Sequence, residues 1–138
     1  MIVVDSNVIA YFYLQGDHTA AADALFSADP EWSSPILWRS EFRSIVTGYL
    51  RRGQLTFEQA VALQREAEEL LSGREFEVDS LAVLELANSN DCSSYDCEFV
   101  ALARQLGTKL ATMDREILRA FPHTAVALSD FGNPRVLT

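Results

Sequence analysis

Two short strand-like segments, each followed by an aspartate, constrain the fold of this chain more than any other feature. Residues 1–4 are apolar and mostly β-branched, which predicts a buried strand, and Asp5 follows before an apolar helix that starts at Val8. Residues 109–112 predict a second short strand, and Asp114 follows it before another helix. Ligands of open α/β sheets bind where the carboxyl ends of parallel strands meet helix N-termini. We therefore expect a parallel β-sheet flanked by helices on both faces, with both aspartates at one edge.

A third acid, Asp96, lies where a carboxylate is costly. Residues 93–107 predict a helix, and at about 100° per residue Asp96 falls inside its apolar stripe with Phe99, Val100 and Ala103. An ionised carboxylate that is buried without a counterion costs several kcal/mol, so such a group has a partner, a metal ion or a shifted pKa. The sequence shows no obvious basic partner for it.

A fourth acid, Glu41, also lies on the apolar face of a predicted helix. Residues 36–52 predict a helix, with Ser33, Ser34 and Pro35 supplying its capping hydroxyls and first-turn proline. Glu41 lies within the apolar arc of this helix, one turn from Leu37 and from Ile45. The nearby Arg39 and Arg43 project about 160 to 200° away and are solvated in our interpretation.

Each acid alone has an ordinary explanation, because an aspartate after a strand is usually a helix cap and a glutamate on a helix is usually solvated. Their combination instead indicates one internal site that a cation holds together. The candidate ligands are all oxygens, without histidine or cysteine, so Mg²⁺ or Mn²⁺ fits and structural zinc does not.

The chain resembles the PIN-domain ribonucleases, and most closely the VapC-like toxins of type II toxin–antitoxin systems. The resemblance covers essentially the whole chain, so we expect a single PIN domain over residues 1–138 with a three-layer PIN-like α/β fold. The segments that carry it are Ile2-Val3-Val4-Asp5-Ser6-Asn7-Val8, Ser40-Glu41-Phe42, Ser94-Tyr95-Asp96-Cys97-Glu98-Phe99-Val100-Ala101-Leu102-Ala103 and Leu110-Ala111-Thr112-Met113-Asp114.

By this resemblance, Asp5, Glu41, Asp96 and Asp114 are the acidic catalytic quartet, and Ser6 and Thr112 occupy supporting polar positions. The implied activity is metal-dependent hydrolysis of RNA phosphodiester bonds by an endoribonuclease. Asp5 and Asp96 are implied as direct ligands of Mg²⁺ or Mn²⁺. Asp114 is also implied as a metal-binding residue. For Asp114 and Glu41 three roles stay open: direct coordination of the ion, coordination through a bound water, or orientation of the nucleophile.

The resemblance also implies partners: an RNA substrate such as tRNA or rRNA, a cognate antitoxin protein and a second copy of the chain in a homodimer. A groove lined by Trp38, Phe42, Phe57 or Val61 is a plausible antitoxin seat. Two alternatives stay open, a non-catalytic PIN-fold binding module and a phosphotransfer or phospho-receiver protein with clustered acids. The single lysine, Lys109, begins its strand rather than ending it, which disfavours the phospho-receiver.

Composition adds limits and one objection. The chain has 138 residues, 49% of them hydrophobic, which suits one compact domain, and no apolar run is long enough for a membrane span, so we expect a cytoplasmic protein. The net charge of −9 argues against a broad basic surface for nucleic acid. Arg52, roughly 16 Å along its helix from Glu41, is a candidate for a nucleic-acid contact.

Further elements follow from local patterns. Thr56-x-x-Gln59 predicts a capping box at the start of a helix over residues 56–71, and residues 125–128 predict a late strand. Glu98 is assigned to the polar face of its helix. Cys92 and Cys97, the only cysteines, are interpreted as small core residues.

Overall fold

The computed structural model describes residues 1–131, and their centre is a parallel sheet. Within this part of the chain the strands are β1 (Ile2–Val4), β2 (Trp32–Pro35), β3 (Glu75–Phe76), β4 (Leu110–Thr112) and β5 (Ala125–Ala127). They pair in the order β3-β2-β1-β4-β5, and every pairing is parallel. The predicted parallel sheet is confirmed, as are the three strands expected at its centre and at one edge.

Two strands were not anticipated. We predicted that Ser33, Ser34 and Pro35 start a helix, and this prediction was wrong. The structure places all three in β2. Both serines are fully buried, and Ser34 is held by backbone and side chain: its N–H donates to the carbonyl of Arg74 at 3.2 Å, and its hydroxyl donates to the carbonyl of Val4. These partners satisfy the polar groups of Ser34 inside the sheet, whereas the buried Ser33 Oγ and Trp32 Nε1 have no hydrogen-bond partner within residues 1–131.

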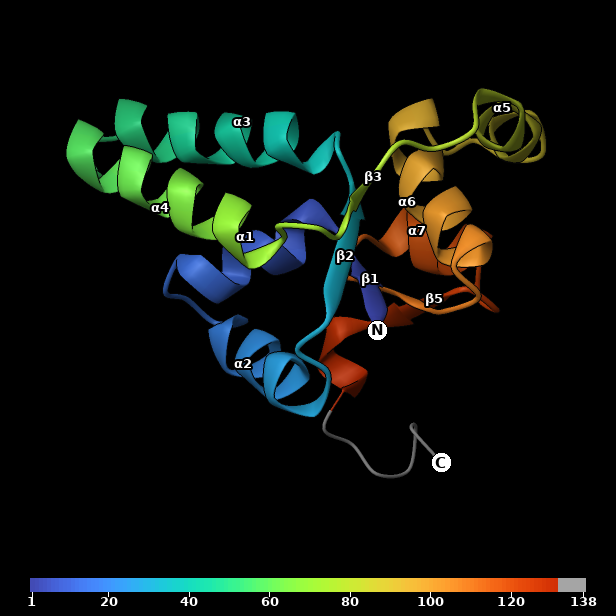
Figure 1. Cartoon of the computed structure of the whole chain (residues 1–138), viewed down its shortest axis with the longest axis horizontal. Coiled ribbons are helices and arrows are strands. Elements are labelled where there is room, and N and C mark those ends of the chain that lie inside the picture. The colour runs from blue at the N-terminus through green and yellow to red at the C-terminus, as the bar shows by residue number, and fades with distance from the viewer. Residues whose placement is uncertain (132–138) are drawn as a thin grey trace.

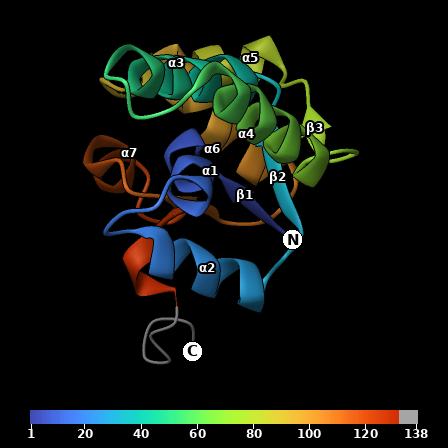
Figure 2. The same ribbon diagram turned by 90° about the vertical axis from the view of Figure 1, so that its left-hand side faces the viewer.

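Seven α-helices within residues 1–131 cover the two faces of the sheet. The helices α1 to α4 lie on one face and α5 to α7 on the other, which gives the three layers visible in Figure 1. Viewed from the side of the first group, α3 and α4 pack together beyond α1, with α2 at the opposite end (Figure 2). The bounds are α1 Ser6–Tyr13, α2 Thr19–Ala28, α3 Trp38–Arg51, α4 Phe57–Leu70, α5 Ser80–Asn88, α6 Ser94–Gln105 and α7 Arg115–Ala120, followed by the 3-10 turn η1 Leu128–Asp130.

Side-chain caps fix several of the helix starts. The predicted capping box at α4 is confirmed: Thr56 Oγ1 accepts from the Gln59 N–H at 3.1 Å, and Gln59 Oε1 accepts from the Thr56 N–H at 2.9 Å. Asp79 caps α5, and Ser93 caps α6. The cap at Ser93 sets where α6 begins, and therefore fixes Asp96 in its first turn.

The core lies between the sheet and both helical layers. Trp38 and Phe42 of α3 are completely buried in it, so these two side chains cannot line the predicted antitoxin groove, whereas Phe57 and Val61, the other residues named for it, are exposed and partly exposed. Cys92 and Cys97 are buried free thiols, as predicted. Within residues 1–131 no helix is both long and apolar enough to cross a membrane.

The connections between strands create a crevice between β1 and β4. From β1 the strand order runs through β2 to β3 at one edge of the sheet, and from β4 it runs to β5 at the other edge. The helices that connect the first three strands, α1 to α4, lie on one face, and α5 to α7 lie on the opposite face (Figure 1). Immediately after β1, the Asp5 N–H donates to the carbonyl of Ala111 in β4 at 3.0 Å. This is the topological switch point of the sheet, where α/β proteins of this kind bind ligands.

Candidate active site

A cavity of about 330 Å³ opens at this switch point, and all four candidate acids line it. Four separate elements deliver them, namely the end of β1, the first turn of α3, the first turn of α6 and the start of α7. The predicted convergence of acids that are distant in sequence is therefore present in the structure. The lining residues are Asp5, Ser6, Asn7, Glu41, Ser44, Ile45, Asp96 and Asp114.

Asp5 is the most buried of the four acids, with 8% of its surface exposed. It caps α1, since Oδ1 accepts from the Ser6 N–H at 2.7 Å, and Oδ2 accepts from the Thr112 hydroxyl at 2.7 Å. Burial raises the pKa of Asp5 to about 7, against the lowering effect of the hydrogen bond from Thr112, and the charges of Glu41 and Asp96 add to the rise. Asp5 is therefore a carboxylate held at a free-energy cost.

Glu41 faces Asp5 across the contact between α3 and α1. Its Oε1 accepts a hydrogen bond of 2.8 Å from the Ser6 hydroxyl, so one serine contacts both acids, Asp5 through its N–H and Glu41 through its side chain. Burial raises the pKa of Glu41, the hydrogen bond from Ser6 lowers it, and the charges of Asp96 and Glu98 raise it further. Ser6 thus contacts two of the four candidate acids, and its supporting role stays a prediction.

Asp96 and Asp114 complete the cavity from the other helical layer. Asp96 is half-buried, and its pKa is raised by burial and then by the charge of Asp114. Asp114 caps α7 through Oδ1, which accepts from the N–H groups of Glu116 at 2.9 Å and Ile117 at 3.1 Å. The Thr112 hydroxyl accepts from the Asp114 N–H at 3.0 Å while it donates to Asp5, so it joins the acids that follow β1 and β4.

Comparisons with known proteins identify the family. The model of the PIN domain matches residues 2–122. The chain belongs to the PIN-domain family. It is 29% identical over 126 residues to ribonuclease VapC3 of Pyrobaculum aerophilum, an alignment that covers 88% of this chain and 95% of that protein.

Solved structures show the same fold. FitAcB from Neisseria gonorrhoeae superposes with a TM-score of 0.73 at 17% identity, over 94% of this chain and 99% of that one. A toxin–antitoxin complex from Klebsiella pneumoniae contains a chain that matches with a TM-score of 0.66 at 14% identity, over 93% of this chain and 98% of that one. The predicted PIN-like α/β architecture is confirmed.

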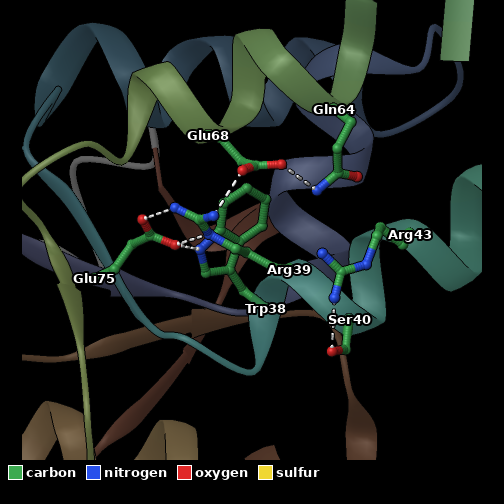
Figure 3. A network of polar contacts seen from close by, with 7 residues as sticks. All are labelled: Trp38, Arg39, Ser40, Arg43, Gln64, Glu68 and Glu75. Atoms are coloured by element: carbon green, nitrogen blue, oxygen red, sulfur yellow. Dashed lines mark hydrogen bonds and ion pairs between the residues drawn. The ribbon is translucent and has the colours of Figure 1, made fainter. Parts of the chain in front are cut away.

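No basic side chain neutralises the four cavity acids within the part of the chain that the structure describes. We had interpreted Arg39 as a solvated charge, but the structure shows that it is paired. Its guanidinium binds both carboxylate oxygens of Glu75 at 2.6 Å and contacts Glu68 at 2.7 Å, and Trp38 Nε1 donates to Glu75 as well (Figure 3). This network ties α3 to β3 and α4, so no arginine among the described residues pairs with Glu41.

Other arginines near the site have local partners. Arg43 donates to the hydroxyl of Ser40 at 3.1 Å (Figure 3). At the end of α3, the guanidinium carbon of Arg52 lies 4.8 Å from the centroid of the Tyr49 ring, and Arg52 Nε donates to Gln54 Oε1 at 2.9 Å. Arg52 does not line the acidic cavity, so its contact with nucleic acid stays a prediction.

The donor set fits a hard divalent cation bound in an open site. Carboxylate and hydroxyl oxygens line the cavity, and Asp5 is a buried acid that no basic group within residues 1–131 pairs with. Among the described residues, however, no three His, Cys, Asp or Glu side chains lie close enough to hold an ion by themselves. An ion here would therefore take part of its coordination shell from water, as Mg²⁺ commonly does.

Two residues that line the site were missed by the sequence analysis. Asn7 and Ser44 line the cavity, and the buried Oδ1 of Asn7 has no hydrogen-bond partner within residues 1–131. The available signal was spacing, because Asn7 lies two residues after Asp5 and Ser44 lies three after Glu41. Glu98, which we assigned to the polar face of its helix, is half-buried and lies on the same side of α6 as the exposed Ser94.

Proposed function

We propose that this PIN domain is a Mg²⁺- or Mn²⁺-dependent endoribonuclease that hydrolyses RNA phosphodiester bonds and acts as the toxin of a toxin–antitoxin pair. The observation that carries the proposal is the cavity at the switch point, where four acids meet without a basic partner among the described residues. The similarity over nearly the full chain to a protein named ribonuclease VapC3 supports the same reaction.

In this proposal Asp5 and Asp96 are direct ligands of the ion, and Asp114 contributes a ligand directly or through water. A divalent ion bound by these carboxylates would supply a water of lowered pKa and stabilise charge on the scissile phosphate. The chain itself provides the arrangement: Thr112 orients Asp5, and Ser6 orients Glu41. In this proposal Glu41, which accepts from Ser6 through one oxygen, would accept a proton from the attacking water through the other.

The acidic composition is consistent with this reaction because the ion, rather than a basic surface, would meet the phosphate. Bound cations are the largest local charges in such sites and reverse the local electrostatics. Arg52 would contribute one contact to the RNA backbone at the far end of α3.

The proposed antitoxin seat moves from the buried Trp38 and Phe42 to a neighbouring cavity. A cavity of about 440 Å³, lined mostly by apolar side chains that include Tyr13, Tyr49, Leu55 and Leu63, lies between the end of α1 and the α3–α4 pair. The proposed homodimer would bury the exposed Leu81 of α5, which is 65% exposed.

The proposal is tested by incubating the purified protein with tRNA and rRNA in the presence of Mg²⁺, Mn²⁺ or EDTA. We expect metal-dependent fragments from the wild type and a loss of at least about a hundredfold in Asp96→Asn. Asp23→Asn, at an exposed position of α2, is the matched control and should cleave normally. Cleavage that survives EDTA, or that Asp96→Asn performs at the wild-type rate, would contradict the proposal.

A further inference from the structure

A second cavity, of about 320 Å³, adjoins the acidic one and takes no part in the function proposed above. It lies between α5, α6 and the connection from β3, which runs past α6 to α5 in Figure 1. Its size is at the lower end of the range for sites that bind small ligands. The lining residues are Val78, Ser80, Val83, Leu84, Ser94 and Glu98.

The first two turns of α6 line both cavities. Asp96 points into the acidic cavity, while Ser94 and Glu98, four residues apart and therefore on one side of the helix, face the second one. The negative charge of Glu98 is near enough to raise the pKa of Glu41. A nucleic acid whose phosphate lies in the acidic cavity would therefore place a neighbouring nucleotide at the second cavity.

Glu98 is the chemical feature that distinguishes the second cavity. It is half-buried, and within residues 1–131 it accepts no hydrogen bond and pairs with no basic group. Because Glu98 lines the cavity, its carboxylate is free to accept hydrogen bonds from a ligand bound there. Val78, Val83 and Leu84 supply apolar contact beside it, and the hydroxyls of Ser80 and Ser94 supply polar contact.

Guanine fits this combination better than the other bases. An ionised carboxylate only accepts hydrogen bonds, and it can accept two side by side. On the Watson–Crick edge, which single-stranded RNA exposes to proteins, guanine alone presents two adjacent donors, N1–H and the N2 amino group. Adenine and cytosine present one amino donor next to an acceptor, and uracil presents one donor between two acceptors.

We infer that the cavity between α5 and α6 is a base-binding subsite, in which Glu98 selects a guanine next to the scissile phosphate. The inference rests on the proposed ribonuclease activity, because it names a sequence preference of that same reaction. Glu98 is then a specificity-determining residue that contacts the substrate but takes no part in bond cleavage.

The first test maps cleavage sites in a pool of random-sequence RNA with Mn²⁺. The wild type should cut with guanine enriched at one fixed position beside the cut. Glu98→Gln should lose most of this enrichment, yet cleave its own best sequences within a few-fold of the wild-type rate. Glu85→Gln, an exposed acid of α5 outside the cavity, is the matched control and should keep the guanine preference.

A second test measures binding without cleavage, by fluorescence anisotropy with Asp5→Asn and single-stranded oligonucleotides. Replacing guanosine by inosine removes the N2 amino donor and should weaken binding about tenfold, the effect of losing one hydrogen bond to a charged group. With Glu98→Gln added to Asp5→Asn, the same replacement should change binding less than about twofold. Circular dichroism and the melting temperature establish that both proteins are folded.

The outcomes separate the two proposals. Metal-dependent cleavage with no guanine preference, or with the same preference in Glu98→Gln, overturns the subsite and leaves the ribonuclease intact. A uniform loss of cleavage on every sequence in Glu98→Gln also overturns it, because that result assigns Glu98 to the reaction itself. If the wild type cleaves no RNA, the proposed function fails, and equal binding of guanosine and inosine oligonucleotides then removes the base site too.

Discussion

Replacing Asp5 by asparagine should stabilise the metal-free protein, and the gain should depend on pH. Asp5 is a buried carboxylate whose pKa is about 7 in the folded protein, against 3.8 for the ordinary group. The folded state therefore binds a proton more tightly than the unfolded state, so Asp5 costs stability as pH rises from 3.8 towards 7. With about 1.4 kcal/mol per pKa unit, the full cost above pH 7 is about 4 kcal/mol.

Asparagine removes this charge but keeps most of the local contacts. Its carbonyl oxygen can accept from the Ser6 N–H, and its amide can donate to the Thr112 hydroxyl, which sit where Asp5 now binds them. We therefore expect Asp5→Asn to exceed the wild type in free energy of unfolding by roughly 2 to 4 kcal/mol near pH 8. The excess should shrink to about 2 kcal/mol or less near pH 5, where Asp5 is protonated in the folded state.

Urea denaturation in EDTA, followed by circular dichroism near pH 8 and near pH 5, measures this difference. The gain near pH 8 corresponds to a rise in melting temperature on the order of 10 °C. The control Asp23→Asn, at an exposed site, should differ from the wild type by less than about 0.5 kcal/mol at both pH values. An Asp5→Asn protein that is less stable than the wild type near pH 8, or whose advantage does not change with pH, would refute the reasoning.

Three further predictions concern hydrogen bonds and ion pairs elsewhere in the structure. Arg39→Ala should lower the free energy of unfolding by roughly 1 to 3 kcal/mol in urea denaturation, because it breaks the network in Figure 3, while Arg43→Ala should cost less than about 0.5 kcal/mol. Equal losses of stability in Arg39→Ala and Arg43→Ala would contradict this prediction. Thr112→Val should raise the pKa of Asp5 further, since it removes the hydrogen bond that lowers it, and NMR titration of the carboxyl should show the shift upward; an unchanged pKa would count against this. Thr56→Ala should cost about 1 kcal/mol through loss of its cap, as measured by thermal unfolding, and no loss of stability would contradict it.

The sheet could be predicted only where the sequence is apolar. The strands β1 and β4 are buried apolar runs, and β5 is a similar run near the end of the described chain. β2 has the sequence Trp-Ser-Ser-Pro, and β3 has only two residues. Both depend on partners distant in sequence, such as the carbonyl of Arg74 that binds Ser34, and local patterns carry no record of such contacts.

All four acids that line the cavity could be named from the sequence. Asp96 and Glu41 were named because a carboxylate on the apolar face of a predicted helix is out of place, and Asp5 and Asp114 because each follows a predicted strand. What the sequence does not carry is the partner of a surface charge. Arg39 pairs with Glu75, which lies 36 residues away.

Glu98 shows another limit of local patterns. Its helical position is on the polar side of α6, but only the structure shows that α5 packs beside α6 and that Glu98 lines a cavity between them. Helical periodicity describes one helix against one core, so it does not predict a second helix on the outer face.

The measurement that tests the central claim most directly is Mn²⁺ binding by isothermal titration calorimetry, made on the wild type, Asp96→Asn and Asp23→Asn. If acids from β1, α3, α6 and α7 together hold a divalent ion, the wild type and Asp23→Asn should bind saturably with equal affinity, and Asp96→Asn should bind at least about tenfold more weakly. Equal Mn²⁺ affinity in all three proteins, or no saturable binding by the wild type at millimolar Mn²⁺, would contradict the account.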